Sequence, residues 1–409
     1  MKAFVSADIL LPQVDSMEKW AVIACDQFVS QPQYWQQVRR NAGDAPSALH
    51  VILPEAELGG DCSSKIRGIN QTMQSYLDGN LFQQYTDSFI YVERTLLSGA
   101  VRCGIIGAVD LEEYDYTPQS TASIRATEKT VVERIPPRMD IRRDAPIELP
   151  HVLLLCDDEK RSVLAAVSSR KAQLPVLYDF DLMEGGGHIT GWLVQGADAD
   201  AFRAALEEYE ARVCARQGSS PVLYAVGDGN HSLASAKGCY EELKRNNPGC
   251  DLSAHPARYA LVELENIHDD SQVFEPIHRI IKATDPNALL QALENSACAE
   301  GGCPVRWFSG DRSGTICLNV KDGQLSVGVL QSFLDAYLAD HPGETDYIHG
   351  DDALQHLSKA PDAIGFLLPA MAKGDLFRGI VADGVLPRKT FSMGHAQEKR
   401  YYLEARKIK

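Results

Sequence analysis

The fold is decided by the stretch Pro221-Val222-Leu223-Tyr224-Ala225-Val226-Gly227-Asp228-Gly229-Asn230-His231-Ser232-Leu233-Ala234-Ser235-Ala236-Lys237. Its apolar run at 221–226 predicts a strand that is buried on both faces. The residues from Ser232 onward predict a helix, so the intervening segment is a strand-to-helix turn. Gly227 and Gly229 allow positive φ in this turn and let a ligand approach the backbone closely.

The same turn has the features of an anion-binding site. The N–H groups and the positive dipole end of a helix N-terminus favour a negatively charged group. Asp228, Asn230 and His231 add a carboxylate, an amide and an imidazole there, and Asp228 can orient a metal or a hydroxyl. We therefore predict that the turn binds a small ligand that carries a phosphate. The alternative is a plain turn in which Asn230 or Ser232 caps the helix.

Strands and helices are predicted on both sides of the turn. Residues 89–94 and 101–106 flank Ser98-Gly99 and predict a β-hairpin. Residues 115–150 are charged and lack periodicity, so we expect a long functional or mobile loop. Farther along the chain we expect a helix from about Phe274.

This mixture of hairpins and βα units predicts an α+β fold instead of a regular doubly wound sheet. We expect a main αβ domain at 1–284, which includes the Asp228-Gly229-Asn230-His231-Ser232 pocket. A C-terminal αβ lobe at 285–409 is expected to pack on it. The glycine-rich segment Glu184-Gly185-Gly186-Gly187-His188 predicts a hairpin turn between two strands.

Composition excludes several classes of protein. The 409 residues carry a formal net charge of −16, with 56 acidic and 40 basic residues, which disfavours binding to a nucleic-acid backbone. No stretch approaches the roughly 20 apolar residues of a membrane helix, and the N-terminus lacks the pattern of a signal peptide. We therefore expect a cytoplasmic protein without membrane or nucleic-acid partners. Its ten cysteines form no CxxC pair and predict reduced thiols.

Two further groups combine imidazole with carboxylates. They are His268-Asp269-Asp270 and His349-Gly350-Asp351-Asp352. Metal sites use such residues, and so do ordinary solvated turns and helix caps. The sequence contains no Walker loop, no GxGxxG fingerprint and no Gly-x-Ser-x-Gly nucleophile elbow.

Several motifs, taken in order, resemble those of a known family. An Asp-Gly-His-His-Arg signature stands here as Asp228-Gly229-Asn230-His231-Ser232, and a His-Glu-x-Thr element stands as Thr127-Glu128-Lys129-Thr130, followed by Pro136-Pro137-Arg138. A Pro-x-His-Arg strand end stands as Pro276-Ile277-His278-Arg279. Over essentially its whole length the chain resembles the bacterial and archaeal family called domain of unknown function 1015. That family is similar to free serine kinases, sulfiredoxins and ParB nucleotide-binding domains. The resemblance implies a mixed-sheet ParB/sulfiredoxin-like core with additional N- and C-terminal αβ lobes.

The resemblance also implies roles for individual residues. Glu128 would deprotonate a substrate hydroxyl, and Asp228 and His231 would lie near the transferred phosphate, a division of roles that suits phosphoryl transfer. Ser232 replaces the signature arginine, so another cation has to stabilise the phosphoryl oxygens. The candidates are Arg125, Lys129, Arg138 and Arg279. The further ligand contacts implied are Gly227, Gly229, Asn230, Ser232, Thr130 and His278.

The predicted function is that of a small-molecule phosphotransferase similar to free serine kinases. The donor would be ATP, ADP or pyrophosphate with Mg²⁺, and the acceptor would be a small molecule that carries a hydroxyl. Two alternatives stay open, because Ser232 replaces the arginine and because water can take the place of the acceptor. They are a non-catalytic nucleotide- or phosphate-binding regulatory module and a hydrolase of phosphate esters or nucleotides.

Overall fold

The computed structural model describes residues 2–321 and 323–409 and divides them into two compact units. The first unit consists of the chain through Ala126, Thr130–Gln272 and His395–Lys409. The second consists of Thr127–Lys129 and Val273–Gly394. The division falls at residue 272 instead of the predicted 284, and the C-terminal residues return to the first unit. No local pattern in the sequence indicates that return.

The first unit is formed by the three chain segments given above and contains both strands and helices. Its strands are β1 Phe4–Val5, β2 Ala7–Pro12, β3 Val22–Ile23, β4 Phe82–Thr95, β5 Val101–Asp110, β6 Tyr114–Asp115, β7 Ile124–Ala126, β8 Ile147–Glu148, β9 Leu153–Cys156, β10 Val176–Leu182, β11 Gly187–Val194, β12 Tyr224–Asp228, β13 Tyr259–Asn266, β20 Tyr401–Tyr402 and β21 Arg406–Lys407. Its helices are α1 Met17–Trp20, α2 Pro32–Ala42, α3 Ser63–Asp78, α4 Ile135–Arg143, α5 Ser162–Ser168, α6 Gly196–Gln217 and α7 Asn230–Asn246.

An 11-stranded mixed sheet forms the centre of this unit, in the order β10-β11-β4-β5-β13-β9-β12-β7-β6, with β1 on β5 and β2 on β4. Strand β9 runs parallel to β13 and antiparallel to β12, and β12 runs parallel to β7. The hairpin predicted around Ser98-Gly99 is confirmed as β4–β5, and the Glu184–His188 turn joins β10 to β11. The predicted α+β class is confirmed. The expectation of a ParB/sulfiredoxin-like core stays a prediction.

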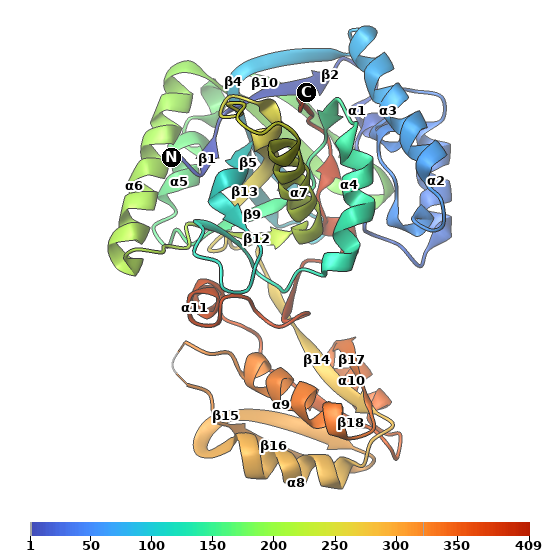
Figure 1. Ribbon diagram of the computed structural model, residues 1–409, viewed down its shortest axis with the longest axis vertical. Helices are drawn as coiled ribbons and strands as arrows, with labels where there is room; N and C mark the ends of the chain where they lie inside the picture. The colour runs from blue at the N-terminus through green and yellow to red at the C-terminus, as the bar shows by residue number, and fades with distance from the viewer. Residues whose placement is uncertain (1, 322) are drawn as a thin grey trace. The chain divides into compact units, whose positions relative to one another are not determined.

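Alternate side chains of the strands enter two hydrophobic cores, because successive residues of a strand point to opposite faces of the sheet. Phe89 and Tyr91 of β4 enter the core that α5, α6 and α7 cover. Ile90 and Val92 enter the opposite core with Trp20, α2 and the C-terminal strand β20. Helices α4 and α7 pack side by side (Figure 1).

The prediction of a long loop at 115–150 is wrong. This segment contains β7, the helix α4 and the short strand β8. Helix α4 reads Ile135-Pro-Pro-Arg-Met-Asp-Ile-Arg-Arg143, and the half-buried Arg138 and Arg142 occupy part of its inward face, so its sequence shows no clear apolar period. Arg125 of β7, a predicted phosphate-binding cation, is also buried. The sequence therefore looked irregular where the chain forms ordinary elements.

The second unit contains a separate six-stranded sheet, in the order β16-β15-β18-β14-β17 with β19 on β14. Its elements are β14 Phe274–Lys282, α8 Pro286–Ala297, β15 Cys298–Ser309, β16 Arg312–Leu318, α9 Ser326–Asp340, β17 Glu344–His349, α10 Asp351–Leu357, β18 Ile364–Leu367, α11 Lys373–Asp383 and β19 Phe391–Met393. The helix predicted from Phe274 is wrong, because this segment is the strand β14. The strand lies between β17 and β18 and is buried on both faces over residues 277–281, so it lacks the alternation that indicates a strand.

The helices and cysteines bear on two predictions made from composition. None of the described helices is long and apolar enough to cross a lipid bilayer. The cysteines whose side chains are described are all free thiols, as the absence of CxxC pairs predicted.

Candidate functional site

The predicted strand-to-helix turn is present in the first unit. Strand β12 ends at Asp228, Gly229 is the N-cap residue, and α7 begins at Asn230. The pairing of β12 with β9 is irregular between Val226 and Asp228, which places a bulge at Gly227. Bulges redirect the side chains next to them, so Gly227 sets the direction of Asp228.

Gly229 is required by its conformation and by its neighbours. Its φ is 78°, in the left-handed region, and a Cβ atom there would meet the Cα and Cγ2 atoms of Val152 at 3.1 Å. The N-cap residue is Gly229, which has no side chain, so neither Asn230 nor Ser232 occupies the N-cap position that the alternative gave them. The first N–H groups of a helix have no partner within it. They are therefore available to an anion at this end of α7.

Asp228 is the acidic group of the turn. Its Oδ1 accepts a hydrogen bond from the Gly229 N–H at 3.0 Å, and its Oδ2 lies 3.3 Å from the Lys399 Nζ. Burial raises the pKa of Asp228, but Lys399 and then His151 outweigh burial and hold it below the usual value. The side chains of Asp228 and Lys399 retain 20% and 16% exposure, so solutes can reach both. The carboxylate is therefore ionised at neutral pH and acts only as a hydrogen-bond acceptor.

His151 lies behind Asp228 and is itself buried. Its Nδ1 lies 2.9 Å from the Tyr402 hydroxyl, which accepts a hydrogen bond from the Cys25 N–H at 3.2 Å. Burial, followed by the charge of Asp26, raises the pKa of the Cys25 thiol to about 12, so this thiol is protonated at neutral pH and is no nucleophile. The chain from Cys25 through Tyr402 therefore orients His151.

Sequence reasoning missed Lys399. The Lys399 carbonyl accepts a hydrogen bond from the Arg94 Nη1 at 2.6 Å. The next residue, Arg400, is buried and forms ion pairs with Glu263 and Glu404. These contacts fix the backbone that delivers Lys399 to Asp228. Because Lys399 comes from the C-terminal segment, no feature near the signature could have identified it.

His231 connects α7 to the segment that follows residue 129. Its Nε2 accepts a hydrogen bond from the Val131 N–H at 3.2 Å, so Nδ1 carries the proton when the ring is neutral. Thr130 directly precedes Val131, and Asn230 directly precedes His231. The Thr130 Oγ1 and the Asn230 Oδ1 are both buried without a hydrogen-bond partner among the described residues. Buried polar atoms without a partner are uncommon, so both atoms are able to hydrogen-bond to a group that binds beside them.

The predicted cations of the first unit are engaged by the protein. The Arg125 guanidinium donates to the carbonyl groups of Ala122 and Ser220, each at 2.9 Å. Ser220 precedes β12, so this guanidinium lies at the opposite end of that strand from Asp228. Arg138 forms an ion pair with Glu55 and donates to the Arg134 carbonyl.

The remaining predicted residues lie in the second unit. Glu128 forms an isolated bridge with Leu386, and Lys129 is exposed. Arg279 is completely buried, and its guanidinium donates to Gln331 and to the carbonyl groups of Ile277, Arg388 and Lys389. The predicted catalytic residues are thus divided, with Asp228 and His231 in the first unit and Glu128 in the second.

His278 and Arg279 are buried on β14, so their ordinary role is structural. The His278 Nε2 lies 3.0 Å from the Asp351 Oδ1, and its Nδ1 accepts a hydrogen bond from the Leu368 N–H. Burial lowers the pKa of His278 and outweighs the effect of Asp351. Burial also lowers the pKa of Arg279 to about 10, although Tyr347 and Glu128 act in the opposite direction.

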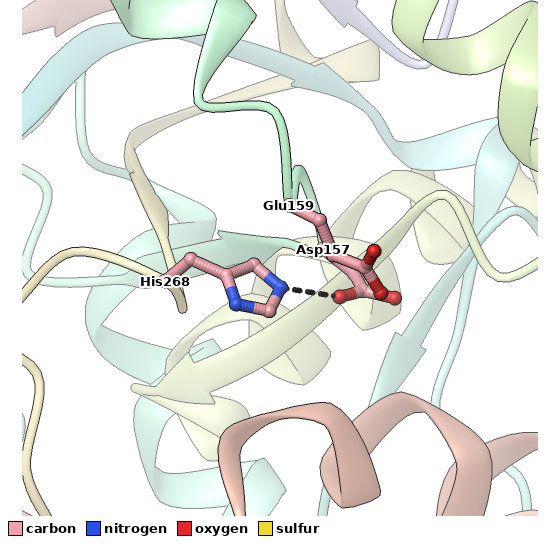
Figure 2. Close-up of side chains that lie close together, drawn as sticks. All are labelled: Asp157, Glu159 and His268. Atoms are coloured by element: carbon pink, nitrogen blue, oxygen red, sulfur yellow. Dashed lines mark hydrogen bonds and ion pairs between the residues drawn. The ribbon is translucent and has the colours of Figure 1, made fainter.

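Two sets of residues could hold a metal ion. Mg²⁺ takes oxygen ligands and is usually held by one or two carboxylates together with substrate phosphates. The ionised carboxylate of Asp228 fits that requirement. The second set is Asp157, Glu159 and His268, whose possible ligand atoms lie within 4.8 Å of one another (Figure 2).

The second set is separate from Asp228. Asp228 pairs with Leu153 at the start of β9, whereas Asp157 follows the last residue of that strand. The Asp157 Oδ1 lies 2.8 Å from the His268 Nε2, and its Oδ2 lies 2.9 Å from the Arg216 Nη2. Both oxygens of Asp157 therefore have protein partners, as do both oxygens of Asp228. The predicted His268-Asp269-Asp270 motif contributes His268 to this group.

A family model described as "Protein of unknown function (DUF1015)" matches residues 10–407. The chain belongs to this family. The match covers parts of both compact units and confirms the resemblance inferred from the motifs. No curated protein matches this DUF1015 protein.

Solved structures similar to this DUF1015 protein include a free serine kinase in complex with AMP, with a TM-score of 0.35 and 13% identity over 74% of this chain and 91% of that chain. A mutant free serine kinase in complex with ADP has a TM-score of 0.38 and 14% identity over the same shares. SbnI with a C-terminal truncation, from Staphylococcus aureus, has a TM-score of 0.36 and 10% identity over 71% of this chain and 82% of that chain. These scores are too low for the ligands of those proteins to bear on this one.

Proposed function

We propose that this DUF1015 protein is a small-molecule phosphotransferase that holds a phosphate-bearing ligand at the N-terminus of α7. The observation that carries the proposal is the uncapped N-terminus of α7 beside the ionised Asp228, with Lys399 in contact with that carboxylate. Such a terminus binds anions through its N–H groups and its dipole. The donor would be ATP, ADP or pyrophosphate, and the acceptor a small hydroxyl compound.

In the proposed reaction the acceptor oxygen attacks phosphorus while the bond from phosphorus to the donor's leaving oxygen breaks. The family resemblance implies Glu128 as the general base for the proton of the acceptor hydroxyl, and Asp228 as the group that orients that hydroxyl or Mg²⁺. The first-turn amides of α7 and the Nδ1–H of His231 donate hydrogen bonds to the phosphate. The Gly229 N–H does not take part, because it already donates to Asp228. Mg²⁺, when bound, neutralises charge on the donor.

The test of this proposal compares turnover in Glu128→Gln with that in Glu133→Gln. Glu133 is an exposed residue of the same region and provides a matched loss of charge. We expect Glu128→Gln to lower kcat by about a hundredfold or more, because a positioned general base contributes about 10²–10⁴-fold. Glu133→Gln should leave kcat unchanged. Equal turnover in both variants and the wild type would show that Glu128 is not the base.

A non-catalytic binding module is the second candidate, and the replacement of the signature arginine by Ser232 favours it. Calorimetry with each donor, followed by product analysis, separates the candidates. Donor binding without any product over hours would support the binding module. Release of free phosphate without a phosphorylated acceptor would indicate a hydrolase.

A further inference from the structure

We propose that Lys399 is the cation that contacts the phosphate of the ligand, in place of the signature arginine that is Ser232 here. This inference rests on the proposed function. A phosphate group needs a cation close to its oxygens, because charge-assisted hydrogen bonds are about twice as strong as neutral ones. The Ser232 hydroxyl cannot supply a positive charge.

The arginines predicted for this role in the first unit have other partners. Arg125 is held by carbonyl groups at the far end of β12, and Arg138 is paired with Glu55. Lys399 is different, because its ammonium group lies at the start of α7. It contacts the carboxylate of Asp228, and the next residue, Gly229, is the N-cap of α7.

The contact of Lys399 leaves it able to receive a ligand. Its Nζ lies 3.3 Å from the Asp228 Oδ2, and both side chains are partly exposed. A lysine ammonium has three donors on a flexible stem, so it can keep one bond to Asp228 and turn another toward a phosphate. The backbone of Lys399 is held by Arg94 and by the buried ion pairs of Arg400, so the start of its side chain is fixed next to Asp228.

A second observation indicates that a ligand binds next to these groups. Thr130 is 6% exposed, and its hydroxyl has no hydrogen-bond partner among the described residues. The adjacent Val131 N–H donates to His231 of α7, so Thr130 lies beside the first turn of that helix. A ligand that contacts the α7 amides, Lys399 and Thr130 needs a phosphate and a further polar group. A phosphate monoester or the end of a nucleotide or pyrophosphate meets that requirement.

The test is calorimetric binding of pyrophosphate and of ADP to the full-length protein and its variants. We expect Lys399→Gln to weaken binding by about tenfold or more and Lys399→Arg to bind within a few-fold of the wild type. The matched control is Lys407→Gln, which removes the same charge from an exposed position of the same C-terminal segment and should have no effect. Far-UV circular dichroism of each variant shows whether the fold is intact.

A double variant separates contact with phosphate from simple neutralisation of Asp228. If Lys399 only neutralises Asp228, Lys399→Gln has no effect on affinity in an Asp228→Asn background, because no carboxylate is left to neutralise. If Lys399 contacts the phosphate, the Asp228→Asn/Lys399→Gln variant binds more weakly than Asp228→Asn alone. Wild-type binding that Lys399→Gln does not weaken would overturn this inference alone. A wild-type protein that binds neither ligand would overturn the proposed function as well.

Discussion

Replacing Arg400 with alanine should strongly destabilise the first unit. Arg400 is 2% exposed and is paired with Glu263 and Glu404, which are 5% and 0% exposed, and its Nε also donates to the Pro150 carbonyl at 3.2 Å. The variant leaves two buried carboxylates without their cation. Removing one partner of a buried pair costs about 3–5 kcal/mol of the free energy of unfolding. We expect the first unit to lose that amount.

Urea unfolding monitored by tryptophan fluorescence provides the assay. Trp20, Trp35 and Trp192 lie in the first unit, and Trp307 lies in the second, so a Trp307→Phe background reports the first unit alone. The Trp20 indole donates to the Leu403 carbonyl at 2.8 Å and therefore reports directly on the C-terminal segment.

The control for this assay is Arg161→Ala, which breaks an exposed pair with Asp270. Exposed pairs contribute about 0–1 kcal/mol, so the control should unfold almost like the wild type. If Arg400→Ala lowers the free energy of unfolding no more than Arg161→Ala does, Arg400 does not stabilise the buried carboxylates of Glu263 and Glu404.

Three further predictions concern single residues. Gly229→Ala should destabilise the protein by more than Gly218→Ala in thermal unfolding. Both glycines have positive φ, which costs about 1–2 kcal/mol for alanine, but of the two only Gly229 has atoms within 4 Å of an added Cβ. Equal losses of stability in the two variants would contradict this prediction. Burial, partly offset by Arg102, raises the pKa of Glu265 to about 8 from a usual 4.5. The folded state thus holds this proton more tightly, so stability falls as pH rises from about 4.5 to about 8. Glu265→Gln should therefore gain stability relative to the wild type across that pH range in urea unfolding, and a difference that stays constant across it would count against the assignment. Tyr402→Phe should cost about 1–3 kcal/mol in the same assay, because it leaves the Cys25 N–H and His151 without a partner; a variant as stable as the wild type would show that the hydroxyl is not needed.

The local part of the candidate site could be predicted from the sequence, and the distant part could not. The apolar run before Gly227 and the spacing of Gly227 and Gly229 are local features, and they correctly predicted a strand, a turn and a helix. Lys399 and His151 reach Asp228 through the tertiary fold. No pattern near the signature indicates either residue.

The partners of the predicted cations also could not be inferred from charge alone. Arg125 and Arg279 were expected near a phosphate because its oxygens need a cation and Ser232 replaces the signature arginine. The structure instead buries both and satisfies them with backbone carbonyl groups and, for Arg279, with Gln331. The strand β14 was mistaken for a helix because it is buried on both faces, and such burial removes the alternation of apolar and polar residues that indicates a strand.

Phosphorus NMR of the protein with Mg²⁺ directly tests whether it transfers a phosphoryl group to a small hydroxyl compound. Each sample contains ATP, ADP or pyrophosphate, with and without serine and a panel of small hydroxyl compounds. Asp228→Asn and the exposed control Asp44→Asn are measured beside the wild type. We expect a new phosphoester resonance in the wild type and in Asp44→Asn that is absent in Asp228→Asn. A phosphoester that forms equally in Asp228→Asn, or none in the wild type with any donor, would contradict phosphoryl transfer at Asp228.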